Sequence, residues 1–75
     1  MNQQALISRI QGLYADAEIQ VTGEGCNFEV NVTSPAFDGM KSLQRQRSIL
    51  TLFSSEIASG ELHALTVRAK TPQEQ

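Results

Sequence analysis

The chain has 75 residues, a formal net charge of −2 and a single cysteine. This length predicts one domain, spanning residues 1–75. The lone cysteine excludes an internal disulfide, and there is no Cys/His cluster with the spacing of a structural zinc site. Because nucleic-acid binders are usually basic, the negative charge argues against a dedicated DNA-binding protein, although a local basic patch is compatible with it.

The N-terminal residues carry no basic side chain and no long apolar run follows them, so a signal peptide is not expected. No stretch approaches the roughly 20 apolar residues of a membrane span. A free thiol suits a reducing compartment. We therefore expect a cytoplasmic protein without a membrane partner.

The first expected element is a helix over residues 3–14, for which Asn2 is a suitable N-cap. Its apolar side chains repeat at i, i+1, i+4, i+7 and i+8 and form one stripe: Leu6, Ile7, Ile10, Leu13 and Tyr14. Two segments with alternating apolar residues, 18–22 and 28–33, then predict an antiparallel hairpin. The connection over residues 23–27 is rich in turn formers and places Cys26 at a loop tip or at the start of the second strand.

A long helix is expected from an N-cap at Ser42 to a terminating glycine at Gly60. Its apolar face comprises Leu43, Ile49, Leu50, Phe53 and Ile57. A third strand follows over residues 62–69, in which period two places His63 on the apolar side and Leu62 on the opposite side. The order α-β-β-α-β predicts an α+β fold, a three-stranded sheet with helices on one face.

Cys26 and His63 stand out because they are the only soft or borderline metal ligands in the chain. If the hairpin packs beside the third strand, both residues lie at the same edge of the sheet. Two alternatives remain open: a lone cysteine is often inert, and a lone histidine on an apolar strand face is often a packed side chain. Zinc and iron–sulfur clusters need about four ligands, so any metal function requires a partner.

Catalysis is not expected, because a Cys–His nucleophile pair also needs an orienting group and an oxyanion hole, for which the sequence has no motif. The basic residues Lys41, Arg45 and Arg47 form a second candidate site. A solvated helix face is the favoured interpretation of these three. The alternative is a patch that contacts phosphate or an acidic partner.

Four segments resemble the BolA family. Residues 30–40 are similar to its strand, serine and Phe-x-Gly pattern, and residues 43–47 resemble its helix start, although Gln46 stands where histidine is usual. Residues 62–65 resemble the family's His-Ala-Leu strand, and residues 71–74 resemble its Thr-Pro-x-Glu pattern near the C-terminal end. The loop with Cys26 and the short tail are most similar to the YrbA/IbaG branch.

The resemblance implies a fold related to class II KH domains and a partnership with a monothiol glutaredoxin. The two proteins would share a 2Fe–2S cluster, with the glutaredoxin cysteine and glutathione on one iron and Cys26 and His63 on the other. It also implies an alternative, a stress-related transcriptional regulator that binds DNA through the helix face with Lys41, Arg45 and Arg47. Homodimerisation through a sheet edge is a third expectation.

Overall fold

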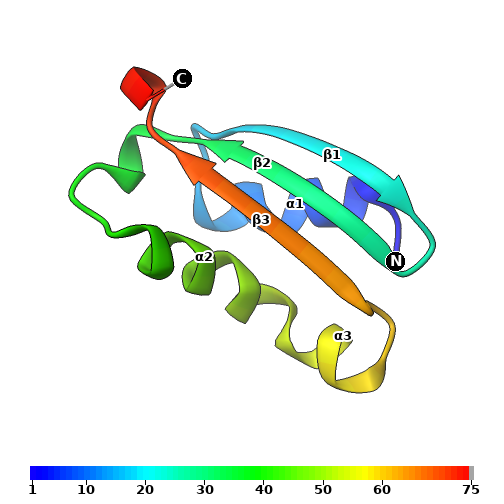
Figure 1. The fold of residues 1–75 in the computed structure, drawn as a ribbon. Helices are drawn as coiled ribbons and strands as arrows, with labels where there is room; N and C mark the ends of the chain where they lie inside the picture. The colour runs from blue at the N-terminus through cyan, green and yellow to red at the C-terminus, as the bar shows by residue number, and fades with distance from the viewer. Residues whose placement is uncertain (75) are drawn as a thin grey trace.

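Three strands form a mixed sheet in the computed structural model, which describes residues 1–74. Gln75, the last residue of the expected domain 1–75, lies outside the described residues. The central strand β2 (Asn27–Thr33) pairs antiparallel with β1 (Glu18–Glu24) and parallel with β3 (Ala64–Lys70). The helices α1 (Gln3–Leu13), α2 (Ser42–Leu50) and α3 (Ser54–Ser59) lie on one side of this sheet (Figure 1). The expected α+β fold is therefore confirmed.

The core lies between the sheet and the helices. The inward side chains of β2 alternate with half-buried or exposed polar ones, as the period of a strand requires. Helices, strands and connections all contribute buried hydrophobic side chains: Leu6, Ile10, Phe28, Val30, Val32, Phe37, Ile49, Phe53, Leu62 and Val67. None of the helices in residues 1–74 is long and apolar enough to cross a membrane.

Helix α1 begins as the sequence predicts, because the Oδ1 of Asn2 accepts a hydrogen bond of 2.8 Å from the backbone N–H of Ala5. Its buried stripe is narrower than expected. Leu6 and Ile10 are buried, but Leu13 is 49% exposed beyond the edge of the core. The hydroxyl of Tyr14 is 2.7 Å from that of Ser48 in α2, which joins the two helices at one end of the sheet.

The expected long helix is interrupted by a 3₁₀ turn, η2 (Thr51–Phe53), between α2 and α3. The backbone carbonyl of Leu52 in this turn accepts a 3.1 Å hydrogen bond from Arg9 of α1. A 3₁₀ turn advances the side chains by a different angle from an α-helix. The apolar side chains before and after the turn therefore no longer lie on one face. Phe53 is fully buried, whereas Ile57, expected on the same face, is 43% exposed.

Both ends of the interrupted helix show how local sequence sets its bounds. The N-cap is Lys41 rather than Ser42, and the backbone N–H of Lys41 donates to the Oε1 of Gln44 at 3.0 Å. Leu43, expected in the core, lies in the first turn and is 56% exposed. At the other end Gly60 adopts a left-handed conformation with a φ of 85°, which confirms it as the terminating glycine.

Strand β3 begins at Ala64, two residues later than predicted. The backbone N–H of Leu62 donates to the carbonyl of Glu56 at 3.0 Å, so Leu62 lies in the connection before the strand and is held against the end of α3. Its side chain is therefore 1% exposed and packs in the core instead of facing away from it. His63, which strand alternation placed on the apolar side, is exposed. The prediction for these two residues was wrong because the strand's alternation does not extend to them.

Candidate functional site

Cys26 occupies the second position of a two-residue hairpin turn. Glu24 and Asn27 pair across the end of the ladder, so only Gly25 and Cys26 connect the strands. Gly25 has a φ of 67°, and glycine at the first position is typical of a type II′ hairpin turn. The turn is shorter than the predicted loop over residues 23–27, because its flanking residues extend the strands. Cys26 is a free, half-buried thiol at this tip.

The main chain of Cys26 meets the segment that enters β3. Its carbonyl accepts one hydrogen bond from the backbone N–H of His63 at 2.8 Å and another from Ala64 at 3.2 Å. These bonds arise because the parallel ladder starts immediately afterwards, with Asn27 opposite Ala64. The structure therefore brings Cys26 and His63 together at one end of the sheet, as the sequence hypothesis required.

The imidazole of His63 is open to solvent beside the glycine that ends α3. A Cβ atom built on Gly60 would lie 3.9 Å from the Nε2 of His63, so the ring lies close to this turn. Since His63 is exposed, the alternative of a packed core histidine does not describe it. Among residues 1–74, no group of three or more His, Cys, Asp or Glu side chains is arranged to hold a metal ion. Cys26 and His63 thus offer two ligands, which is half of a four-ligand site.

The basic candidates do not act as one group, because Arg45 has a partner within the chain. Its guanidinium forms a bidentate ion pair with Glu74 and also donates to the carbonyl of Met40 at 2.9 Å. The side chain is only 11% exposed. The hydrogen bonds from Arg45, and then that from the backbone of Thr71, lower the pKa of Glu74 to about 2. Lys41 and Arg47, in contrast, are exposed at the surface.

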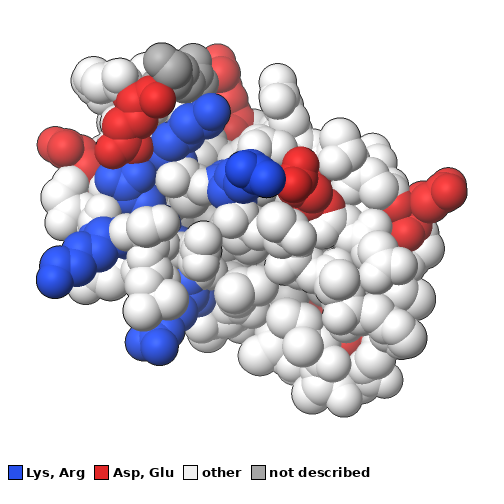
Figure 2. Space-filling model, in the orientation of Figure 1, with Lys and Arg blue, Asp and Glu red and all other residues white. Residues whose placement is uncertain are grey.

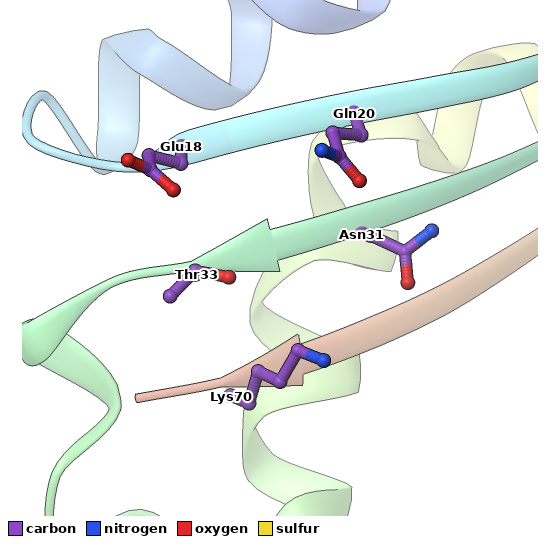
Figure 3. A pocket seen from close by; sticks show the side chains of 5 residues that line it. All are labelled: Glu18, Gln20, Asn31, Thr33 and Lys70. Carbon is purple, nitrogen blue, oxygen red and sulfur yellow. The ribbon is translucent and has the colours of Figure 1, made fainter. Parts of the chain in front are cut away.

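The open face of the sheet carries a polar hollow of about 320 Å³ that the sequence reasoning did not single out. Figure 3 shows its lining side chains standing on three adjacent strands: Glu18, Gln20, Asn31, Thr33 and Lys70. The outward positions of the strand alternation are the signal that could have found it. These groups are hydrogen-bonding oxygens and nitrogens without a sulfur or imidazole ligand. The hollow lies at the far end of the strands from Cys26, so it belongs to a different site.

A mixed three-stranded sheet with helices on one face, and a half-buried cysteine beside an exposed histidine at one end, define a small α+β protein. The BolA-like protein family model matches residues 8–74. The chain therefore belongs to the BolA family.

Two relatives are similar to this chain in sequence. A protein encoded in the rpoN-murA intergenic region of Acinetobacter guillouiae is 35% identical over 74 residues, covering 99% of this chain and 89% of the relative. The acid stress protein IbaG of Escherichia coli strain K12 is 33% identical over 57 residues, covering 76% of this chain and 68% of the relative. The resemblance to the IbaG branch is thereby supported at the level of sequence.

Two solved structures share the fold. BolA1 from Arabidopsis thaliana superposes with a TM-score of 0.84 at 26% identity, covering 96% of this chain and 93% of that one. The BolA domain of SufE1 from the same plant gives a TM-score of 0.83 at 27% identity, covering 100% of this chain and 99% of that domain.

Proposed function

We propose that this protein is a non-enzymatic partner of a monothiol glutaredoxin in the cytoplasm, and that the two together bind, transfer or sense a 2Fe–2S cluster. In this proposal Cys26 and His63 hold one iron. The glutaredoxin cysteine and a glutathione thiol hold the other. The observation that supports the proposal is the pair of hydrogen bonds from the backbone N–H groups of His63 and Ala64 to the carbonyl of Cys26, because they bring a cysteine and a histidine to one end of the sheet.

The local structure supports this role in two ways. The hairpin turn and the start of β3 are joined through the backbone, so the spacing between Cys26 and His63 does not depend on either side chain. Both donors are also suited to iron, because thiolates hold iron–sulfur clusters and histidine replaces thiolate in some of them, raising the reduction potential. Two ligands alone leave a cluster incomplete, which explains why a partner is needed.

The test reconstitutes the cluster from the chain, a monothiol glutaredoxin, ferrous iron, sulfide and glutathione, and records the visible absorption and circular dichroism. We expect His63→Ala and Cys26→Ser to alter the spectrum and to shorten the lifetime of the cluster. Asn27→Ala is the matched control, because it removes an exposed side chain next to Cys26 that offers iron no thiolate or imidazole. If both ligand variants match the wild type in spectrum and lifetime, the assignment of Cys26 and His63 is wrong.

A second candidate function is DNA binding by a stress-related regulator. Its support is the gathering of basic side chains on the left of the molecule in Figure 2. Lys41 and Arg47 are exposed. Arg45 belongs to the predicted contact surface but is engaged by Glu74. We therefore expect Lys41→Ala with Arg47→Ala to weaken binding to a DNA duplex more than Arg45→Ala does, with a reduced dependence on salt. Equal affinity for the wild type and the Lys41/Arg47 double variant would eliminate this surface.

We also propose that the chain forms a homodimer through a sheet edge. Both β1 and β3 are edge strands, and edge strands have backbone groups with which a second copy can pair. Light scattering over a range of protein concentrations distinguishes a dimer from a monomer.

A further inference from the structure

Charged side chains are divided unevenly between the two ends of the molecule. We use the term Cys–His end for the hairpin turn at residues 24–27 together with residues 60–64. Its charged side chains, apart from His63, are Glu24 and Glu61, and both are exposed. In Figure 2 the blue side chains lie to the left and centre, whereas the right-hand end, where the hairpin turn lies, shows only red and white.

All six lysine and arginine residues lie outside the residues of the Cys–His end: Arg9, Lys41, Arg45, Arg47, Arg68 and Lys70. Three of them are already paired with carboxylates, Arg9 with Glu56, Arg45 with Glu74 and Arg68 with Glu29. The α-ammonium of Met1 lies 3.8 Å from the Oε2 of Glu61. It leaves the side chain of Glu61 57% exposed.

The two carboxylates are close enough to act on Cys26 and His63. Glu24 is two residues from Cys26 and Glu61 is two residues from His63, which limits each backbone separation to about 7 Å. The Debye length at physiological ionic strength, about 8 Å, is of the same order, so screening by salt is incomplete. With His63 neutral, residues 24–27 and 60–64 carry a formal charge of −2, of which the Met1 ammonium offsets one, so the field at the Cys–His end is negative.

A negative field opposes what the proposed function would place there. A 2Fe–2S cluster held by thiolates carries negative charge, because its sulfides and thiolates outweigh the ferric ions, and glutathione adds a further net negative charge. The chain supplies no lysine or arginine at this end to offset the repulsion. The compensating cations must therefore come from the molecule that completes the site.

We propose, on the basis of the proposed function, that the Cys–His end selects a protein partner that surrounds its own cluster ligands with lysine or arginine side chains. Complementary charge raises the rate of encounter and disfavours acidic partners. Glu24 and Glu61 are the residues that provide this selection. They bind no iron in the proposal and act only through their charge.

The first experiment measures the field without any partner. Cys26 is the only cysteine, so its reaction with a small disulfide reports on this position alone. The thiolate attacks one sulfur, a mixed disulfide forms, and the other half leaves as a thiol. The probes are cystamine, which is cationic, and dithiodiglycolate, which is anionic, each compared with neutral hydroxyethyl disulfide to remove differences in accessibility.

We expect the ratio of the cystamine rate to the dithiodiglycolate rate to be higher in the wild type than in the Glu24→Gln/Glu61→Gln variant, by about threefold or more at low ionic strength. The comparison is made between chains because the leaving thiols of the two probes differ intrinsically. Asp16→Asn with Glu18→Gln is the matched control, because it removes the same charge at the opposite end of β1 and should leave the ratio unchanged. If the Glu24/Glu61 variant keeps the wild-type ratio, the inference is overturned.

The second experiment uses the complex with a monothiol glutaredoxin, iron, sulfide and glutathione. We expect the association rate to fall as salt is added, and to fall at low salt in the Glu24/Glu61 variant but not in the Asp16/Glu18 variant. A cluster that forms equally well in both variants refutes the selection by charge while leaving the proposed function intact. If the wild-type chain forms no cluster at all, the proposed function fails, and the disulfide rates still decide whether the field exists.

Discussion

Arg45 and Glu74 form a bidentate ion pair, with Nη1 to Oε1 at 2.6 Å and Nη2 to Oε2 at 3.2 Å. The pair joins α2 to the 3₁₀ turn η3 (Pro72–Glu74), across 29 residues of chain. The Oε1 of Glu74 also accepts from the backbone N–H of Thr71 at 2.8 Å, so one carboxylate closes the turn and attaches it to the helix. Residues that the sequence assigned to separate features thus form one unit.

This pair makes stability depend on pH in the acid range. The pKa of Glu74 is about 2 in the folded chain, below the ordinary value of 4.5, so the unfolded chain binds more protons between these values. The contribution of Glu74 is therefore complete above about pH 4.5 and is lost as the pH falls towards 2. We expect Glu74→Gln to be less stable than the wild type at pH 6 and closer to it at pH 2.5, as measured by urea unfolding.

Glu18→Gln is the control for this prediction, since Glu18 is an exposed carboxylate of the edge strand β1 that forms no ion pair with another residue in 1–74. It should leave the difference in stability between the two pH values nearly as in the wild type. A Glu74→Gln variant with the wild-type pH dependence would show that Arg45 does not hold this carboxylate in solution.

Two leucines should exchange the roles that the sequence pattern predicts for them. Leu62 is 1% exposed in the core, so Leu62→Ala should lower the free energy of unfolding by about 2–5 kcal/mol. Leu43 is 56% exposed, so Leu43→Ala should change it by no more than about 0.5 kcal/mol. Chemical denaturation of the two variants makes the comparison. Equal losses in both would contradict the placement of β3 and of the first turn of α2.

Two glycines provide a test of the hairpin that carries Cys26. A Cβ on Gly23 would lie 2.3 Å from the backbone oxygen of Asn27, and its φ is 104°, so Gly23→Ala should cost at least about 1–2 kcal/mol. Gly12 lies within α1, and a Cβ there would meet nothing within 4 Å. Gly12→Ala should therefore stabilise the chain by about 0.5–1 kcal/mol, because alanine favours helix. Thermal unfolding would show shifts of opposite sign.

The candidate ligands should be dispensable for folding. Cys26 joins the start of β3 through its backbone carbonyl, which Cys26→Ser retains, and His63 is exposed. Each of Cys26→Ser and His63→Ala should change the free energy of unfolding by less than about 1 kcal/mol. Circular dichroism and urea unfolding check this result. If either variant lost much stability, its effect on cluster formation would reflect partial unfolding of the chain and not the loss of an iron ligand.

Much of the fold is readable from local sequence patterns. The alternation in β1 and β2, the Asn2 cap and Gly60 as a terminator depend on short-range sterics and hydrogen bonds, and the structure confirms all of them. The interruption at η2 was not predicted from local sequence; the carbonyl of Leu52 in this turn accepts a hydrogen bond from Arg9, 43 positions away along the chain. Beyond the interruption Ile57, expected on the apolar face, is exposed.

The candidate site likewise combines features that the local sequence predicts with features that tertiary contacts decide. The sequence by itself determined that Cys26 and His63 are the only soft or borderline ligands, that Cys26 lies in or beside the hairpin connection, and that the two are too few for a metal site. Their proximity was decided by the parallel pairing of β2 with β3, which closes a long loop and brings the carbonyl of Cys26 to the N–H of His63. Tertiary structure also placed Arg45 against Glu74 and left the Cys–His end without a lysine or arginine. Charge sums over a sequence do not record such placements, because they arise from contacts between segments that are distant along the chain.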